Sequence, residues 1–236
     1  MIRLDKFLAD MGCGTRSEIK KDIRKGLAQV DGKVVKDAGT LLSGTETVTF
    51  KGETVVYEDK VYYMLNKPAG VLSATEDRNC KTVLDIIDEN RRKDLFPVGR
   101  LDIDTEGLLL ITNDGAMAHR ILSPAHHVDK IYFARVSGRL TQEDVLAFSE
   151  GLKLSDDFTA LPAKLDIISS GDTSEAYVTI REGKFHQVKR MFLKRGCEVI
   201  YLKRLAMGPV TLDPDLAPGE YRRLSEKEIT LLKEIR

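Results

Sequence analysis

Three acidic side chains, Asp102, Asp104 and Glu106, stand at alternate positions in the stretch GRLDIDTEGLLLITNDG, residues 99–115. The apolar run 108–111 follows directly and predicts a buried strand. Carboxylates in such a group can act as metal ligands, as acid–base pairs or as nucleophiles. Asp102 differs from the other two because apolar residues flank it on both sides, an unusual setting for a solvated acid. Asp104 and Glu106 have the composition of an ordinary turn.

A calcium site is the first interpretation, since Asp102, Asp104, Glu106 and Gly107 occupy positions 1, 3, 5 and 6 of an EF-hand loop. Position 12 is Asn113 instead of the bidentate glutamate that closes such a loop, and this argues against calcium.

A glycosidase pair is the second interpretation, and it needs two carboxyl groups about 5–10 Å apart in a sugar-binding cleft. Alternate residues of an extended segment can span that distance, but the chain has no tryptophan and few aromatic residues to stack on sugar rings. The residues alone leave two interpretations of Asp102 open: a nucleophilic carboxylate, or an acid with a structural role.

A basic segment lies further along the chain, REGKFHQVKRMFLKRGCEVIYLKRL, residues 181–205, with eight Lys or Arg and two acids. On a helix starting near Phe185, the spacing places Val188, Met191 and Phe192 on the core face. Other side chains would then lie largely off that face: His186, Lys189, Arg190 and Lys194. Such a cationic helix suits a phosphate backbone, or an ion pair that keeps a buried carboxylate charged.

The N-terminal segment predicts two short helices and a small sheet. One helix has Leu4, Phe7, Leu8 and Met11 on one face, and a second starts at the capping-box pair Thr15 and Glu18. Ile19 and Ile23 would be buried on that second helix, whose other face carries Arg16, Lys20, Lys21, Arg24 and Lys25. Asp31-Gly32 predicts a hairpin turn, and 48–50 a further strand. Residues 1–36 hold nine Lys or Arg against five acids, which fits either a solvated helix face or an RNA-binding surface. The two short helices followed by the hairpin favour RNA binding.

The remaining pattern predicts an α+β fold, because strands and helices alternate without a βαβ period. Residues 52–60 form a polar linker, so we expect a small RNA-binding domain at 1–58 and a second domain at 59–236. Strands are expected at 61–65, 108–112, 130–136 and 177–180. Helices are expected at 82–88, 117–122, 143–151, 185–194 and from Ser225 to the end of the chain.

Composition excludes several classes of protein. Lys plus Arg and Asp plus Glu are 37 each, so net charge indicates no polyanionic partner. Three distant cysteines without a CxxC pair, and four histidines without ligand spacing, indicate neither a disulfide framework nor a zinc site. The charged N-terminus is no signal peptide, and no apolar run reaches about 18 residues. We therefore expect a cytoplasmic protein that does not enter a membrane.

The acidic stretch, together with YYMLNKPAG before it and GKFHQVKRMF after it, resembles the pseudouridine synthases, in the RsuA branch that acts on ribosomal RNA. HRILSPAHHVDKIYFARV and DLAPGEYRRLSEKEI are similar to the small-subunit (16S) enzymes of that branch. The segment RLDKFLADMGCGTRSEIKKDIRKGLAQVDGKVV is similar to the S4 RNA-binding domain. The resemblance covers nearly the whole chain. It implies a catalytic domain with a mixed, mainly antiparallel sheet and flanking helices.

The resemblance implies a role for each matching residue. Asp102 would be the catalytic aspartate and Tyr132 the active-site tyrosine. Lys189, or alternatively Arg190, would pair with the aspartate. Further residues would contact RNA. They are Arg100, which enters the helix when the target base leaves it, Arg190 in HQVKRM, Asn66 and Lys67 of a mainly structural first motif, and Arg3, Lys6, Arg16, Lys20 and Arg24 of the S4 domain.

The implied activity is the isomerisation of a uridine in 16S rRNA to pseudouridine. Nothing is oxidised and no group is donated, so the resemblance implies no cofactor and no metal. The aspartate would either attack C1′ or help remove the C2′ proton to give a glycal, and the sequence leaves both routes open. The expected partner is rRNA in an assembling small subunit, bound by a monomer. Two alternatives are a 23S rRNA pseudouridine synthase of the same branch and a non-catalytic rRNA-binding assembly protein.

Overall fold

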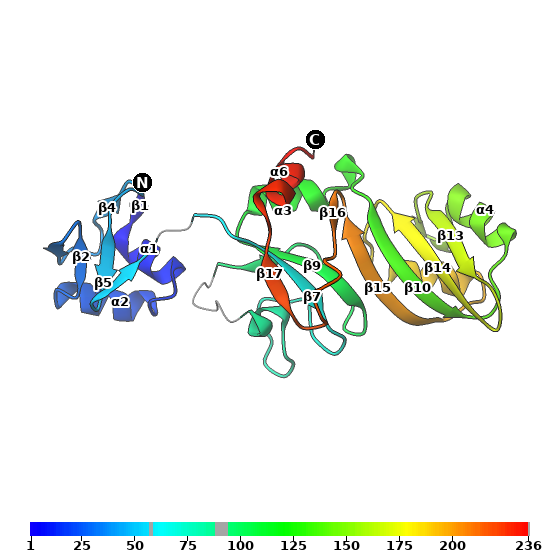
Figure 1. Cartoon of the computed structure of the whole chain (residues 1–236), viewed down its shortest axis with the longest axis horizontal. Helices are drawn as coiled ribbons and strands as arrows, with labels where there is room; N and C mark the ends of the chain where they lie inside the picture. Colours follow the sequence, from blue (N-terminus) through cyan, green and yellow to red (C-terminus); the bar gives the residue numbers. More distant parts are fainter. Residues whose placement is uncertain (57–58, 88–93, 236) are drawn as a thin grey trace. The chain divides into compact units, whose positions relative to one another are not determined.

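The computed structural model describes residues 1–56, 59–87 and 94–235 (Figure 1). The chain divides into two compact units: Met1–Val61 with Ile87–Leu95, and Tyr62–Ile86 with Phe96–Arg236. Each unit has a hydrophobic core of its own. The boundary predicted after residue 58 falls at 57–58, outside the described residues. No described helix is long and apolar enough to cross a membrane.

The N-terminal unit has the predicted helices and small sheet. Helix α1 (Leu4–Asp10) and helix α2 (Arg16–Arg24) bury Leu4, Phe7, Leu8, Ile19 and Ile23. Its antiparallel sheet has the order β3 (Lys33–Val35), β2 (Ala28–Val30), β5 (Val48–Phe50) and β6 (Glu53–Val55), and β1 (Ile2–Arg3) pairs with β4 (Leu41–Leu42).

Local sequence signals set two boundaries in this unit. Thr15 caps the start of helix α2: its side chain accepts from the backbone of Glu18, and Glu18 accepts from the Thr15 backbone at 2.9 Å. This is the predicted capping box. Asp31 and Gly32 have φ angles of 49° and 75°, the left-handed pair that a tight hairpin turn requires. The predicted hairpin between β2 and β3 is therefore confirmed.

The larger unit is built on a nine-stranded sheet, visible across the centre and right of Figure 1. Its main path is β13 (Lys164–Ser169), β14 (Thr173–Ile180), β10 (Lys130–Ser137), β15 (Val199–Met207), β9 (Glu106–Thr112), β7 (Tyr62–Lys67) and β17 (Tyr221–Arg223). Two short strands lie off this path: β16 (Val210–Thr211) and β8 (Phe96–Pro97). β9 and β15 pair in parallel and the other neighbours are antiparallel, which confirms the predicted α+β fold with a mixed sheet.

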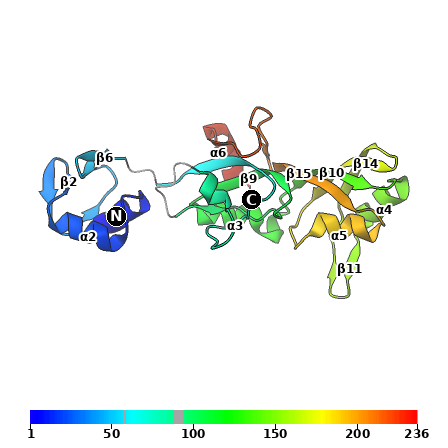
Figure 2. The same cartoon turned by 90° about the horizontal axis from the view of Figure 1, so that it is seen from below.

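Helices and short turns complete this unit. They are η1 (Val83–Ile86), α3 (Gly115–Leu122), η2 (Pro124–His126), α4 (Gln142–Glu150), α5 (Gln187–Lys194) and α6 (Glu226–Lys233), with a hairpin of β11 (Lys153–Ser155) and β12 (Phe158–Thr159). Helix α5 contacts β15 and the β11 strand of that hairpin (Figure 2).

Two predicted helices are corrected. The helix expected from Phe185 begins at Gln187, because His186 has a left-handed φ of 50° that a helix cannot continue through. The helix expected at 82–88 is a single 3₁₀ turn, Val83–Ile86, and Asp88 lies outside the described residues. The predicted core face of α5 is confirmed, since Val188, Met191 and Phe192 are buried.

A glycine makes the close approach between β9 and β15. Gly107 pairs with Arg204 in the parallel register and has a φ of 101°. A Cβ at this position would collide with the Arg204 backbone oxygen and nitrogen. Because only glycine tolerates both the conformation and the contact, it brings the acidic loop before β9 against β15.

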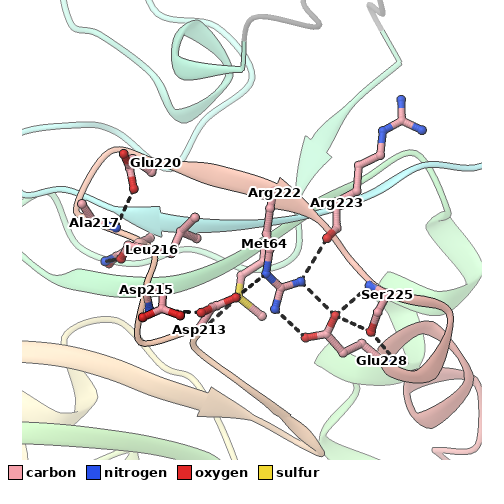
Figure 3. Close-up of polar contacts among 11 residues, drawn as sticks. Met64, Asp213, Asp215, Leu216, Ala217, Glu220, Arg222, Arg223, Ser225 and Glu228 are labelled. Atoms are coloured by element: carbon pink, nitrogen blue, oxygen red, sulfur yellow. Dashed lines mark hydrogen bonds and ion pairs between the residues drawn. The ribbon is translucent and has the colours of Figure 1, made fainter.

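The C-terminal segment is fixed to the sheet by Arg222 of β17 (Figure 3). The Arg222 guanidinium lies 2.6 Å from Asp213 and 2.9 Å from Glu228. Glu228 also accepts from the Ser225 backbone at 2.7 Å, which is the predicted capping box of α6. The hydrogen bonds from Arg222 lower the pKa of Glu228 to about 2, despite the opposing effect of burial. This ion-pair network therefore favours the charged carboxylate and holds α6.

Candidate active site

Asp102 lies in the loop 99–105, which runs from β8 to β9 and is held by buried polar contacts. Ser73 Oγ accepts from the backbone N–H of Leu101 at 3.0 Å and donates to its carbonyl oxygen at 2.9 Å. The N–H of Thr105 donates to the carbonyl oxygen of Asp102 at 3.1 Å, and Gly70 donates to Ile103 at 2.7 Å. The loop is therefore anchored on both sides of the acidic residue.

Lys67 provides the strongest anchor of this loop. Its side chain is 0% exposed, and Nζ donates to the carbonyl oxygens of Pro68, Ile103 and Thr105 at 2.9, 3.2 and 2.9 Å. All three donors of the ammonium group are used. Burial lowers the pKa of Lys67 to about 8, although the carboxylate of Asp104 opposes the shift.

Asn66, beside it on β7, is 1% exposed and donates to the Leu216 carbonyl oxygen at 2.7 Å. Neither side chain reaches the surface, so their burial gives no support to the predicted RNA contacts of Asn66 and Lys67, which stay predictions. Both side chains fix backbone instead, as expected for a mainly structural motif.

The structure places Lys189, in the first turn of α5, against two carboxylates of the acidic loop. Its Nζ lies 3.3 Å from Asp102 Oδ2 and 2.5 Å from Asp104 Oδ1. Burial alone would lower the pKa of Lys189, but the hydrogen bond to Asp104 and the charge of Asp102 together raise it. The hydrogen bond from Lys189 lowers the pKa of Asp104. The pKa shifts of Lys189 and Asp104 therefore favour a charged ion pair, which the Asp102 carboxylate adjoins.

Arg190, the alternative partner, points elsewhere. One Nη of Arg190 lies 3.4 Å from the Leu154 carbonyl oxygen, and its guanidinium lies 5.8 Å from the centre of the Phe158 ring. Both contacts are on the β11–β12 hairpin. The structure thus brings Lys189 to Asp102 and does not bring Arg190 there.

Two contacts of this cluster were not foreseen from the sequence. Asp104 was expected only to shape the turn, yet it shares the ammonium group of Lys189 with Asp102. His186 Nε2 lies 3.6 Å from Asp102 Oδ1, and its ring stacks on the exposed ring of Phe185. The acidic stretch and HQVKRM can each be recognised in the sequence. They lie far apart along the chain, so the sequence pattern does not reveal the Lys189–Asp104 and His186–Asp102 contacts.

A pocket opens beside the cluster, between the acidic loop, β10, β15 and the start of α5. Asp102, Lys189 and Tyr132 line it, so the three predicted catalytic residues share one pocket. Tyr132 is 7% exposed and lies opposite Arg204 in the β10–β15 register. Arg100 also lines the pocket and is exposed to solvent. Two further lining residues, Lys130 and Arg204, are buried cations that the sequence analysis missed.

The predicted RNA contacts of the N-terminal unit are divided between paired and exposed cations. Arg3 and Lys20 lie 3.0 and 3.7 Å from the buried Asp5, and Lys6 lies 2.7 Å from Asp10. Two others, Arg16 and Arg24, are exposed on α2. Three of the five predicted contacts in this unit, Arg16, Lys20 and Arg24, therefore lie on α2.

No group of three or more potential metal-ligating side chains occurs among the described residues. The acidic loop also lacks the coordination of a calcium site, because Asp102 and Asp104 face Lys189.

Known proteins resemble this chain over nearly its whole length. Residues 61–194 match the RNA pseudouridylate synthase family, and residues 2–48 match the S4 domain. The chain is 49% identical to an uncharacterized RNA pseudouridine synthase, YtzG, of Bacillus subtilis, over 99% of both chains. It is 41% identical to ribosomal small subunit pseudouridine synthase A of Escherichia coli, over 97% of this chain and 98% of the relative.

A solved structure supports the same relationship. A crystal structure of a pseudouridylate synthase matches 98% of this chain and 100% of its own, with a TM-score of 0.69 and 38% identity.

Proposed function

We propose that this chain, which belongs to the RNA pseudouridylate synthase family, isomerises a uridine of 16S rRNA to pseudouridine with Asp102 as its reactive carboxylate. The observation that carries this proposal is the contact of Asp102 with Lys189 in a pocket that Tyr132 also lines. The small-subunit target is supported by the 41% identity to ribosomal small subunit pseudouridine synthase A of Escherichia coli over nearly the whole chain.

The reaction breaks the N1–C1′ bond of uridine, turns the uracil and joins C5 to C1′. A carboxylate beside the sugar serves this reaction in either of two ways: it attacks C1′, or it takes the C2′ proton to give a glycal. Both require an ionised acid in a partly dry pocket, and the ammonium group of Lys189 at 3.3 Å favours that charge. The atoms of the product are those of the substrate, so the reaction as we propose it uses no cofactor.

Tyr132 and Arg100 fit two supporting roles. The ring of Tyr132 faces the pocket, where it would stack on the uracil and take the C5 proton after the new bond has formed. The target base must first leave its stack, which costs a few kcal/mol. Arg100 is exposed at the same pocket, and its side chain would fill the gap in the RNA.

The S4 unit would supply affinity for folded rRNA through the exposed cations of α2. We expect a monomer that acts on the small subunit during its assembly.

The test is tritium release from C5-labelled uridine in 16S rRNA, in partial small-subunit particles and in 23S rRNA. We expect release from the small-subunit RNA. Release from 23S rRNA alone would support pseudouridine synthesis but would show that the target is 23S rRNA and not 16S rRNA. Binding without release from any of the three would favour a non-catalytic assembly protein.

A further inference from the structure

Two buried cations lie in the active-site pocket apart from the carboxylate cluster. Lys130 of β10 is 5% exposed and Arg204 of β15 is 2% exposed, and both line the pocket. Arg204 lies opposite Tyr132 in the strand register, and Lys130 is two residues before Tyr132 on the same face of β10. Both charges therefore lie on the strands that present the tyrosine.

The protein leaves these charges incompletely compensated. Arg204 Nε donates to the Leu108 carbonyl oxygen at 2.8 Å, but one buried Nη has no hydrogen-bond partner. Lys130 Nζ donates to the Val128 carbonyl oxygen at 3.0 Å. Within the described part of the chain, neither cation lies within ion-pair distance of a carboxylate.

The nearby acid Glu182 is already engaged. It is buried, and its Oε1 accepts from the Leu161 N–H at 2.7 Å and from Gln187 at 2.8 Å. Burial, and next the charge of Arg204, lower the pKa of Lys130 to about 8. Asp129 and Glu182 act on Lys130 only from a distance. Two buried cations without a carboxylate in ion-pair contact destabilise a fold, so their presence in a pocket indicates a ligand with negative charge or acceptor oxygens.

We propose that Lys130 and Arg204 bind the carbonyl oxygens of the flipped uracil and stabilise the uracilate anion that forms when the N1–C1′ bond breaks. This inference rests on the pseudouridine synthase activity and names groups that stabilise the negative charge on the departing base, which the carboxylate of Asp102 cannot do. The bond's electron pair stays with the base, and the charge spreads from N1 onto the ring oxygens. Asp102 has the same sign of charge, and Lys189 is shared between two carboxylates.

The uracil is negatively charged only while it is detached from the sugar, so Lys130 and Arg204 are needed only during that step. After the base turns, C5 forms its bond to C1′ and loses its proton, while N1 gains one. The neutral product then no longer needs the two cations. Their apolar neighbours in the pocket, Ile180, Leu202 and Met207, suit a flat base better than a hydrated phosphate.

The test compares uridine with 5-fluorouridine in the same 16S rRNA fragment, in single-turnover reactions. Chromatography of nucleoside digests follows the loss of the N1–C1′-linked nucleoside, because the isomer has the same mass. 5-Fluorouridine has no C5 proton to lose, so the comparison scores only the N1–C1′ cleavage and the new C5–C1′ bond. Fluorine helps the ring carry negative charge, so 5-fluorouracil leaves with less help from the protein. We expect Lys130→Met to slow the reaction of uridine about 100-fold, as the loss of one oxyanion donor does. With 5-fluorouridine, the loss should be at least tenfold smaller.

Three further variants make the comparison decisive. Lys130→Arg should restore most of the rate because it keeps the charge, whereas Arg204→Met should repeat the selective loss. Lys203→Met, on the opposite face of β15, is the matched control and should react like the wild type.

Equal losses with both substrates would overturn the proposal. A weaker RNA affinity with an unchanged single-turnover rate would also overturn it and would assign the cations to a phosphate. Wild-type activity on uridine is measured separately, so a failure of the proposed function is distinguishable from a failure of this inference.

Discussion

Replacing Lys67 with methionine separates the stability of the fold from the positioning of its reactive loop. The side chain is fully buried, and its ammonium group donates to three carbonyl oxygens around the loop 99–105. Methionine has a similar length and fills the same space, but it donates no hydrogen bond. The three carbonyl groups would lose their shared partner.

The expected cost in stability is moderate because two effects oppose each other. Three lost hydrogen bonds at about 1 kcal/mol each would destabilise the protein by about 3 kcal/mol. The ammonium group is itself costly to bury, as its pKa of about 8 indicates, and methionine relieves that cost. We expect a net loss of about 1–2 kcal/mol in the free energy of unfolding.

The expected cost in activity is larger. A shift of about 1 Å in a reacting group costs on the order of 100-fold in rate. Lys67→Met should therefore slow single-turnover tritium release about 100-fold, while RNA affinity stays within about threefold. Denaturant unfolding and RNA binding are measured on the same preparation.

Lys164→Met is a matched control, since Lys164 is exposed and forms an ion pair with the partly exposed Asp166. It should change stability by less than about 0.5 kcal/mol and leave the rate unchanged. A Lys67→Met protein that unfolds like the wild type and keeps its full rate would refute the anchoring argument.

Three other changes test separate parts of the account. Asp104→Asn should reduce the rate by no more than about tenfold, because the ammonium group of Lys189 then pairs with Asp102 alone. Complete loss of tritium release would show that Asp104 itself is required. Glu228→Gln should lower the free energy of unfolding by about 2 kcal/mol at pH 7. The pKa of Glu228 is lowered to about 2, so its contribution is present above about 4.5 and fades as pH falls toward 2; a pH-independent difference in urea midpoints would contradict this. Arg16→Gln with Arg24→Gln should flatten the plot of log affinity against log salt by about one unit per lost phosphate contact; an unchanged slope would remove α2 from the RNA footprint.

Local signals in the sequence predicted the elements well where the chain itself determines them. The capping boxes at Thr15 and Ser225 fix helix starts through contacts three residues apart. The apolar run 108–111 became a central buried strand, as its continuous pattern predicts. The start of helix α5 was predicted too early, because the side-chain pattern does not indicate the left-handed backbone of His186.

The candidate site depended more on resemblance than on pattern. Lys189 meets Asp104 across 85 positions of the chain, so no periodicity could pair them. The RNA contact of Lys67 was expected from the resemblance of its motif alone, and the structure buries the side chain among carbonyl groups. Arg204 was missed because a cation in an alternating strand is expected on the solvent side. The catalytic and RNA-contact roles of the other site residues remain predictions.

Single-turnover tritium release by Asp102→Asn, measured beside the wild type on 16S rRNA, tests the central claim most directly. Asparagine keeps the shape of the side chain but removes its charge. We predict no detectable release, with RNA affinity and unfolding close to those of the wild type. Release at the wild-type rate by a folded, RNA-bound Asp102→Asn protein would contradict the assignment of Asp102 as the reactive carboxylate.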